Sequence, residues 1–261
     1  MKRLLFFLLV SVLLAAFALT SETTYSKGPP DNVLREYMAL GNSLGVGVGA
    51  SDPATKGYVP LFRDFLESKD GLKKKLVLNN LSVGGATSAT LISAQLPSAV
   101  AELEARNQDK RPNNDVKVIT VDIGGNDVFA LIPVCSGGFT PACITAVTNT
   151  LGTFSTNFDS ILGDLRSAAG PDTTIIVMTF DNPLPSCFLA SLAPVADIVL
   201  EGGGPLPAGL NDLIRAIAAT HDAEVADMFG KLGAGDWVGD CLHPNDSGYE
   251  IIAEEFAEEF K

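Results

Sequence analysis

Five short apolar segments recur at wide spacing along this chain of 261 residues, and segments of helical periodicity separate them. The apolar segments cover residues 37–40, 76–81, 116–123, 174–180 and 224–228. The clearest helical segments cover residues 58–66, 90–105, 144–168, 210–220 and 247–260. Strands that alternate with helices fold into a parallel sheet through right-handed crossovers, with helices on both of its faces. We therefore predict one three-layer α/β/α domain with a five-stranded parallel sheet.

Two longer stretches, residues 131–150 and 182–210, lack this alternation and are predicted to be irregular. Long loops in α/β folds usually shape the site at the carboxyl ends of the strands. The second stretch contains an apolar segment, residues 188–200. That segment would either line an apolar binding pocket or cap the core, and the sequence leaves both interpretations open.

The N-terminus has the pattern of a secretory signal peptide. Lys2 and Arg3 precede an apolar run over residues 4–19, and Ala16 and Ala18 supply the small residues of a cleavage site. The run is shorter than the roughly 20 residues that a membrane-spanning helix needs. We expect a signal peptide at 1–18, an exposed segment at 19–34 and the folded domain at 35–261. The protein would then be secreted or periplasmic, with no stable membrane span; an uncleaved anchor is the alternative.

The charge of the chain limits its partners. Its 31 acidic residues exceed the 18 basic ones, which gives a net charge of −13. Contacts with phosphate groups need clustered Lys and Arg, so we expect no nucleic-acid partner and no docking on anionic lipid. We also expect the chain to act as a monomer.

Four cysteines in a secreted chain predict disulfides. A zinc site is disfavoured because pairs of the form Cys-x₂₋₄-Cys are absent. Cys135 and Cys143 flank a short loop with Gly and Pro, and this closeness makes them the expected first pair. Cys187 and Cys241 then pair by elimination.

Two histidines, His221 and His243, are candidates for a catalytic base. His221 lies where a helix passes into the segment 224–228, which is a common position for a structural histidine. His243 follows Asp240 by three residues, just before the last helix. A short loop of this kind brings a carboxylate to the imidazole, where it fixes the tautomer and stabilises the imidazolium. We predict His243 as the base and Asp240 as its partner.

Ser43 is the candidate nucleophile, in the sequence Gly-Asn-Ser-Leu-Gly at 41–45, directly after the first apolar segment. A serine in a strand-to-helix turn is exposed at the carboxyl edge of the sheet, where backbone amides can point at an oxyanion. A P-loop would need Gly-Lys-Ser/Thr, and a dinucleotide fingerprint needs a different glycine spacing. The pentapeptide also matches the nucleophile elbow of α/β-hydrolases, but that elbow follows a mid-chain strand and its acid lies far from the histidine.

Two further turns supply donors for an oxyanion. Gly85 follows the second apolar segment in Gly-Gly-Ala-Thr, and Asn126 follows the third in Gly-Gly-Asn-Asp. Parallel strands end at one edge, so Ser43, Gly85, Asn126 and His243 are expected to converge there. The N–H groups of Ser43 and Gly85 and the side-chain amide of Asn126 would form the oxyanion hole.

These four blocks resemble those of the SGNH (GDSL-type) esterases and lipases, which supply Ser, Gly, Asn and His in this order. The resemblance extends from about residue 37 to the C-terminus. It implies a flavodoxin-like sheet with strand order 2-1-3-4-5, a nucleophile at Ser43, and neither a metal nor an organic cofactor. One position departs from the family pattern, because the usual Asp before the serine is Asn42 here.

The expected chemistry is hydrolysis of a small ester, or of an acylated glycan or lipid, through an acyl-enzyme. Ser43 attacks the carbonyl while His243 takes its proton, and His243 then protonates the leaving alcohol and activates water. Because only the neutral imidazole acts as a base, activity should rise with pH. The alternatives are a polysaccharide O-acetylesterase or acyltransferase, and a domain that binds a glycan or lipid without turning it over.

Overall fold

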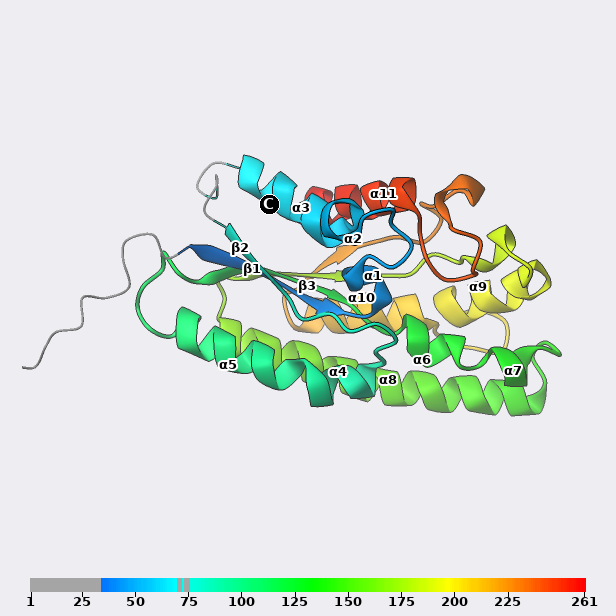
Figure 1. Cartoon of the computed structure of the whole chain (residues 1–261). Coiled ribbons are helices and arrows are strands. Elements are labelled where there is room, and N and C mark those ends of the chain that lie inside the picture. The colour runs from blue at the N-terminus through cyan, green and yellow to red at the C-terminus, as the bar shows by residue number, and fades with distance from the viewer. Residues whose placement is uncertain (1–33, 70–71, 73–75) are drawn as a thin grey trace, which may run out of the picture. The chain divides into compact units, whose positions relative to one another are not determined.

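The computed structural model describes residues 34–69, 72 and 76–261 (Figure 1). The predicted signal peptide at 1–18, and all of the predicted exposed segment at 19–34 except Leu34, lie outside the described residues.

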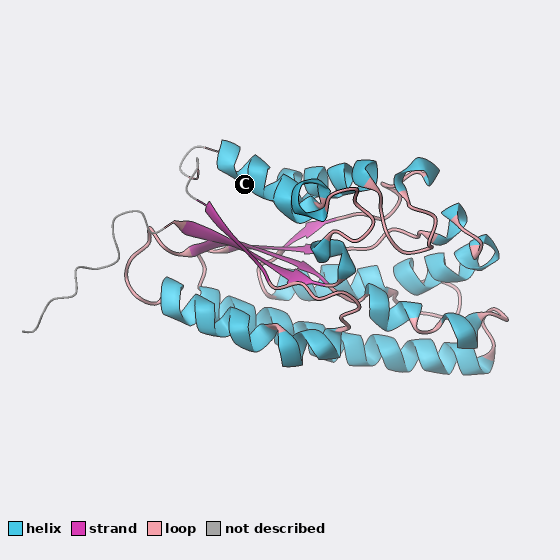
Figure 2. Ribbon diagram, viewed as in Figure 1, coloured by secondary structure: helices cyan, strands magenta, loops and turns pink. Residues whose placement is uncertain are grey.

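Five parallel strands form one sheet in the order β2-β1-β3-β4-β5, which confirms the predicted fold (Figure 2). Their bounds are β1 (Arg35–Gly41), β2 (Leu76–Asn80), β3 (Val116–Asp122), β4 (Thr174–Met178) and β5 (Glu224–Ala226). In the register of the central pair, Gly41 at the end of β1 lies beside Asp122 at the end of β3. Turns that leave these two strands therefore start side by side at the carboxyl edge.

Helices cover both faces of the sheet (Figure 1). On one face lie α3 (Tyr58–Ser68) and α11 (Asp246–Glu259), where the rings of Tyr58 and Phe256 stack at 4.9 Å. On the other lie α5 (Leu96–Asn107), α8 (Pro141–Ala169) and α10 (Leu210–Thr220). Burial of large side chains on both faces is the main stabilising contribution to a three-layer fold of this kind. Within the described residues, no helix has the length and apolar character that crossing a membrane requires.

The shorter helices gather in the loops that follow the strands. They are α1 (Ser43–Val46), α2 (Pro53–Lys56), α4 (Ser88–Ala94), α6 (Gly125–Phe129), α7 (Ile132–Cys135) and α9 (Ala193–Glu201), with 3₁₀ turns at Leu184–Ser186, Ala190–Leu192 and Ala234–Asp236. The helix predicted at 90–105 is in fact two, α4 and α5, which meet at Gln95. Pro97 has no N–H to donate to the preceding turn, so a single continuous helix loses a hydrogen bond there.

The two stretches predicted to be irregular contain helices. Residues 131–150 hold α7 and the start of α8, which Thr140 caps by accepting the Cys143 N–H at 3.2 Å. Residues 182–210 hold α9, whose apolar residues gave no polar face for a helical pattern to reveal. The predicted strand ends also extend slightly too far: the Phe180 N–H donates to Asn211 Oδ1 on α10 at 2.9 Å instead of continuing the ladder.

Candidate active site

Ser43 lies in the tight turn that leaves β1 at the carboxyl edge. Asn42 caps the four-residue helix α1, because its Oδ1 accepts the Leu44 N–H at 2.9 Å. Gly41 has no space for a side chain, since a Cβ there would lie 2.4 Å from the carboxylate of Asp122. Glycine at this position therefore lets the turn approach the end of β3 and fixes where Ser43 emerges.

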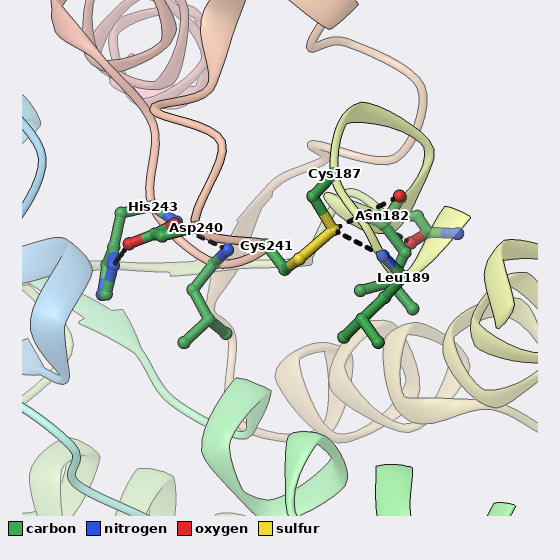
Figure 3. Close-up of a disulfide and its surroundings, with 8 residues drawn as sticks. Asn182, Cys187, Leu189, Asp240, Cys241 and His243 are labelled. Carbon is green, nitrogen blue, oxygen red and sulfur yellow. Dashed lines mark hydrogen bonds and ion pairs between the residues drawn. A yellow bond between two sulfur atoms is a disulfide. The ribbon is translucent and has the colours of Figure 1, made fainter. Parts of the chain in front are cut away.

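The hydroxyl of Ser43 meets the imidazole of His243 from the far end of the chain. Ser43 Oγ lies 2.8 Å from His243 Nε2, and His243 Nδ1 lies 2.6 Å from Asp240 Oδ2 (Figure 3 draws the Asp240–His243 contact). An ionised carboxylate only accepts hydrogen bonds, so Nδ1 carries the ring proton and Nε2 is left to accept the proton of Ser43. The three residues predicted as nucleophile, base and acid form one continuous chain of hydrogen bonds.

Asp240 is held in its ionised form by its own loop. Its Oδ1 accepts the backbone N–H groups of Leu242 at 2.9 Å and His243 at 2.8 Å, while Oδ2 faces the ring. Partial burial raises the pKa of Asp240, but the hydrogen bonds from the His243 ring and these two N–H groups outweigh it and leave the pKa below its usual value. The carboxylate therefore stays charged, and oriented on the imidazole, well into the acid range.

The three predicted oxyanion donors lie on turns that the structure links together. Asn126, near the start of α6, donates one side-chain N–H to Ala86 O at 2.9 Å, which attaches it to the residue after Gly85. Its other amide hydrogen remains available. Gly85 adopts φ +78°, where a side chain would be strained, and the space around its α-carbon is open. In the described part of the chain, the N–H groups of Ser43 and Gly85 donate to no other residue.

Asp127 strengthens the link between these two turns. Its carboxylate accepts the backbone N–H of Ser88 at 2.9 Å and the hydroxyl of Ser88 at 2.6 Å. Ser88 begins α4, directly after the turn that carries Gly85. The neighbour of Asn126 thus anchors the helix that follows Gly85, so the two donors are held at a fixed separation.

Both predicted disulfides, Cys135–Cys143 and Cys187–Cys241, are present. Cys241 lies between Asp240 and His243, and its bond to Cys187 ties their loop to the segment after β4 (Figure 3). Cys241 adopts φ +70°, a backbone conformation that is costly for a residue other than glycine. The second disulfide therefore holds the loop of the base in a conformation it would not favour alone.

Replacing Cys187 and Cys241 together by alanine is expected to lower the free energy of unfolding by about 4 kcal/mol, because a crosslink between residues 54 apart restricts the unfolded chain strongly. Replacing Cys135 and Cys143, which are 8 apart, is the matched control and should cost about 2.5 kcal/mol by the same relation. Denaturant unfolding measures both. A larger loss from the short crosslink would contradict this explanation.

A largely apolar pocket opens beside Ser43 and Asn126, with a volume of about 1070 Å³ that includes space open to solvent. Its wall contains Leu192, Val195, Ala196, Val199 and Leu200, all from the segment that the sequence left as either pocket wall or core cap. Four of the nine residues of α9 (Ala193–Glu201) thus line the pocket, and Leu192 directly precedes the helix. Phe188, at its start, is 83% exposed and does not belong to the lining.

His221 takes no part in this arrangement. It lies at the carboxyl end of α10, with Nε2 2.8 Å from Asp159 Oδ1 on α8. The contact joins two helices on one face of the sheet. This placement agrees with the prediction that His221 has a structural role.

Three buried residues that the sequence analysis did not single out support the Ser43 turn. Gln95, at the junction of α4 and α5, accepts the Gly41 N–H at 2.9 Å and donates to the Gly41 carbonyl at 2.8 Å. Asp122 accepts the Asn42 N–H at 2.8 Å and the Tyr58 hydroxyl at 2.5 Å. The position of Asp122 at the end of a strand, next to the strand that leads into Ser43, could have identified it from the sequence. No sequence feature indicates the roles of Gln95 and Tyr58.

Comparison with solved structures finds chains of the same fold. A lipase, Lip_vut3 from a goat rumen metagenome, superposes with a TM-score of 0.65 at 20% identity, over 87% of this chain and 97% of that one. Axe2, an acetylxylan esterase from Geobacillus stearothermophilus, superposes with a TM-score of 0.58 at 15% identity, over 87% and 95%. Likeness at these identities establishes a shared fold.

Sequence comparison gives the family. The chain is 25% identical over 264 residues to the uncharacterized protein YpmR of Bacillus subtilis (strain 168), covering 97% of this chain and 94% of that protein. Residues 39–251 match the model of the GDSL-like lipase/acylhydrolase family, a range that includes the carboxyl end of β1 and the Asp240–His243 loop. Because this match spans most of the sequence and every residue of the site, the chain belongs to the GDSL-like lipase/acylhydrolase family.

Proposed function

We propose that the protein is a secreted serine hydrolase that cleaves carboxylic esters through an acyl-enzyme on Ser43. The observation that carries the proposal is the continuous hydrogen-bond chain from Ser43 Oγ through His243 to Asp240, at 2.8 and 2.6 Å. A serine hydroxyl is a weak nucleophile unless an adjacent base removes its proton. Membership of the lipase/acylhydrolase family supports esters as the substrate class.

The reaction proceeds in two halves. Ser43 Oγ attacks the ester carbonyl carbon as its proton passes to His243 Nε2, and the carbonyl oxygen becomes an oxyanion. The intermediate collapses with cleavage of the bond to the alcohol oxygen, which takes the proton from Nε2 and leaves. Water then loses a proton to Nε2 and attacks the acyl-enzyme, and collapse of this second intermediate returns the proton to Ser43 and releases the acid.

Three N–H donors would stabilise both oxyanions. They are the backbone amides of Ser43 and Gly85 and the amide hydrogen of Asn126 that Ala86 leaves free. Donors fixed before the reaction stabilise the developing charge without reorganisation, and one such donor contributes about 10²- to 10³-fold to turnover in comparable enzymes. The links from Asn126 to Ala86 and from Asp127 to Ser88 support this pre-organisation.

The acyl group of the substrate is proposed to be an aliphatic chain that extends into the pocket beside Ser43. The pocket wall along α9 is apolar, and burial of each methylene of an acyl chain there contributes about 0.8 kcal/mol. An acetyl group would leave most of this surface in contact with water. The lipase name of one structural neighbour agrees with this substrate class.

Filling the pocket should therefore shorten the preferred acyl chain. We expect Ala196→Phe to lower kcat/KM for p-nitrophenyl octanoate about tenfold or more, because the ring occupies space that several methylenes would use, while the value for the acetate changes little. Ile198→Phe, on the same helix but outside the pocket lining, is the control and should keep the wild-type profile. An unchanged profile in Ala196→Phe would exclude α9 as the wall of the acyl site.

Hydrolysis of p-nitrophenyl esters from acetyl to palmitoyl tests the proposed function as a whole. An optimum beyond acetyl supports an esterase or lipase. An optimum at acetyl would instead favour a polysaccharide O-acetylesterase, an activity of the kind that Axe2 is named for. Transfer of the acyl group to an added alcohol in preference to water would indicate an acyltransferase. No turnover of any ester would favour a binding domain.

Secretion is supported by the two disulfides, which form and persist in oxidising compartments. The signal-peptide pattern of residues 1–18 agrees with it. N-terminal sequencing of protein recovered outside the producing cell tests this part. A start near residue 19 is expected, and an intact Met1 on a membrane-bound protein would contradict it.

A further inference from the structure

A buried carboxylate lies directly beneath the nucleophile turn. Asp122 is fully buried, and its carboxylate accepts hydrogen bonds from the Asn42 N–H at 2.8 Å and the Tyr58 hydroxyl at 2.5 Å. A third donor, the backbone N–H of Gly45, also lowers the pKa of this carboxyl. No Lys or Arg of the described residues forms an ion pair with it. Burial of an unpaired charge is costly, so these three donors alone compensate the carboxylate.

The same aspartate holds the residue before Ser43 at two points. Asn42 donates its backbone N–H to Asp122 Oδ1 and its side-chain Nδ2 to the Asp122 carbonyl at 3.0 Å, while its Oδ1 accepts the Leu44 N–H. Both the amide nitrogen and the amide oxygen of the Asn42 side chain are thus used, and the residue is 2% exposed. With Asn42 fixed in this way, the peptide between Asn42 and Ser43 has one orientation.

That peptide carries the Ser43 N–H, the oxyanion donor nearest the nucleophile. We propose that Asp122 is a positioning residue that sets the orientation of the Asn42–Ser43 peptide and so aims the Ser43 N–H at the oxygen of the ester. The inference rests on the acyl-enzyme chemistry proposed above and adds a residue that does not touch the substrate.

The charge of this positioning residue changes near neutral pH. Burial raises the pKa of Asp122 to about 7, against the hydrogen bonds from Asn42, Tyr58 and Gly45, which lower it. The titratable groups that face it are Tyr37 on β1, Tyr58 on α3 and Tyr249 on α11, and burial raises the pKa of each, so all three stay neutral. Turnover should thus fall on acidification as the Asp122 carboxylate is protonated.

Asp122→Asn tests the role of the carboxylate. The amide places an N–H₂ where one oxygen accepted, so at least one of the three donors loses its partner. We expect kcat to fall about tenfold to a hundredfold with KM unchanged, because a small misorientation in a catalytic site has effects of this size. We also expect the ionisation near pH 7 that Asp122 contributes to the wild-type pH profile to be absent in this variant.

Glu36→Gln is the matched control. Glu36 is another carboxylate that is 2% exposed, but it lies at the opposite end of β1 and pairs with Arg106. Its replacement should change stability without changing kcat or the form of the pH profile. Equal kinetic effects of Asp122→Asn and Glu36→Gln would show a general effect of lost stability and overturn the proposal.

Tyr58→Phe gives a second test that keeps the carboxylate. The Tyr58 hydrogen bond lowers the pKa of Asp122, so its removal should move the Asp122 midpoint in the pH profile to higher pH. A profile with an unchanged midpoint would contradict the assignment. This variant also covers the case in which Asp122→Asn does not fold.

Asn42→Asp, which restores the usual family residue, is expected to harm this enzyme. A carboxylate at 42 cannot donate to the Asp122 carbonyl, and it adds a second negative charge beside Asp122 in a site that is nearly closed to water. Combining it with Asp122→Asn removes one charge, so the double variant should be more active than the product of the two single effects predicts. If the effects of the two substitutions on the free energy of activation were strictly additive, residues 42 and 122 would not be coupled.

A measurement without substrate separates this inference from the proposed function. The Asn42 backbone amide signal in an NMR pH titration should shift with a midpoint near 7 in the wild type and not in Asp122→Asn. Wild-type turnover that survives Ser43→Ala would defeat the acyl-enzyme proposal and leave this titration standing. The absence of the Asn42 shift would defeat the positioning role even in an active enzyme.

Discussion

Ser43→Ala is expected to lower kcat for p-nitrophenyl butyrate by about 10⁴- to 10⁶-fold, the range found when a serine nucleophile is removed from other triad enzymes. The alanine lacks the Oγ that lies 2.8 Å from His243 Nε2. His243 therefore has no hydroxyl proton to accept, and no oxygen is present to carry the acyl group. Any residual rate should come from water attacking an ester held in the oxyanion hole, and it should show no burst of p-nitrophenol.

Ser51→Ala is the control for that experiment. Ser51 lies in the loop after α1, and its hydroxyl donates to Asp246 and to none of Ser43, Asp240 and His243. Its kcat should stay within about twofold of the wild type, as is usual for an exposed substitution outside a catalytic site. Equal turnover in Ser43→Ala and the wild type would remove Ser43 from the mechanism.

Asp240→Asn should have the second largest effect, a fall in kcat of about 10⁴-fold, as for the corresponding change in other triads. One oxygen of Asp240 accepts two backbone N–H groups and the other accepts the ring N–H. The oxygen of an asparagine side chain can still accept the two backbone N–H groups, but its N–H₂ then faces Nδ1 of His243. Because N–H₂ is a donor, it selects the imidazole tautomer with the proton on Nε2. His243 can no longer accept the proton of Ser43.

Asp246→Asn, an aspartate-to-amide change at the start of α11, is the matched control and should leave kcat nearly unchanged. The pH dependence supplies a second check on Asp240. Its pKa is lowered in the folded protein, so the stability contributed by its hydrogen bonds is present above the usual aspartate pKa and is lost only as pH falls through the lower value. If Asp240 in the wild type were protonated at or above the usual aspartate pKa, the claim that its hydrogen bonds lower its pKa would be wrong.

The sheet, and the convergence of the residues proposed to react, were predictable because each leaves a local signal. Buried parallel strands read as short apolar runs, and glycine-rich turns mark where they end. Ser43, Gly85, Asn126 and His243 follow such strands or precede the last helix, so convergence at one edge followed from topology alone. The pairing of Cys135 with Cys143 was likewise local, since the two flank one short loop.

The supporting residues were not predictable because their roles depend on contacts between distant segments. Gln95 reads as an ordinary helical residue, yet the break before Pro97 turns it inward to hold both backbone groups of Gly41. The partnership of Tyr58 with Asp122 joins α3 to the end of β3 and has no counterpart in sequence spacing. Helix α9 was missed because Asp197 and Glu201 are the only polar side chains among its nine residues, too few to give the amphipathic pattern that identifies a helix.

Covalent labelling of Ser43 is the most direct test of the proposed mechanism. An alkyl fluorophosphonate should react with the folded wild-type protein, with Ser43 Oγ displacing fluoride from phosphorus and His243 accepting the proton. Peptide mass spectrometry should then find the phosphonyl group on the peptide that contains Ser43, in step with loss of esterase activity, and find no label in Asp240→Asn on the same timescale. Complete inactivation with the label on any other residue would show that Ser43 is not the nucleophile.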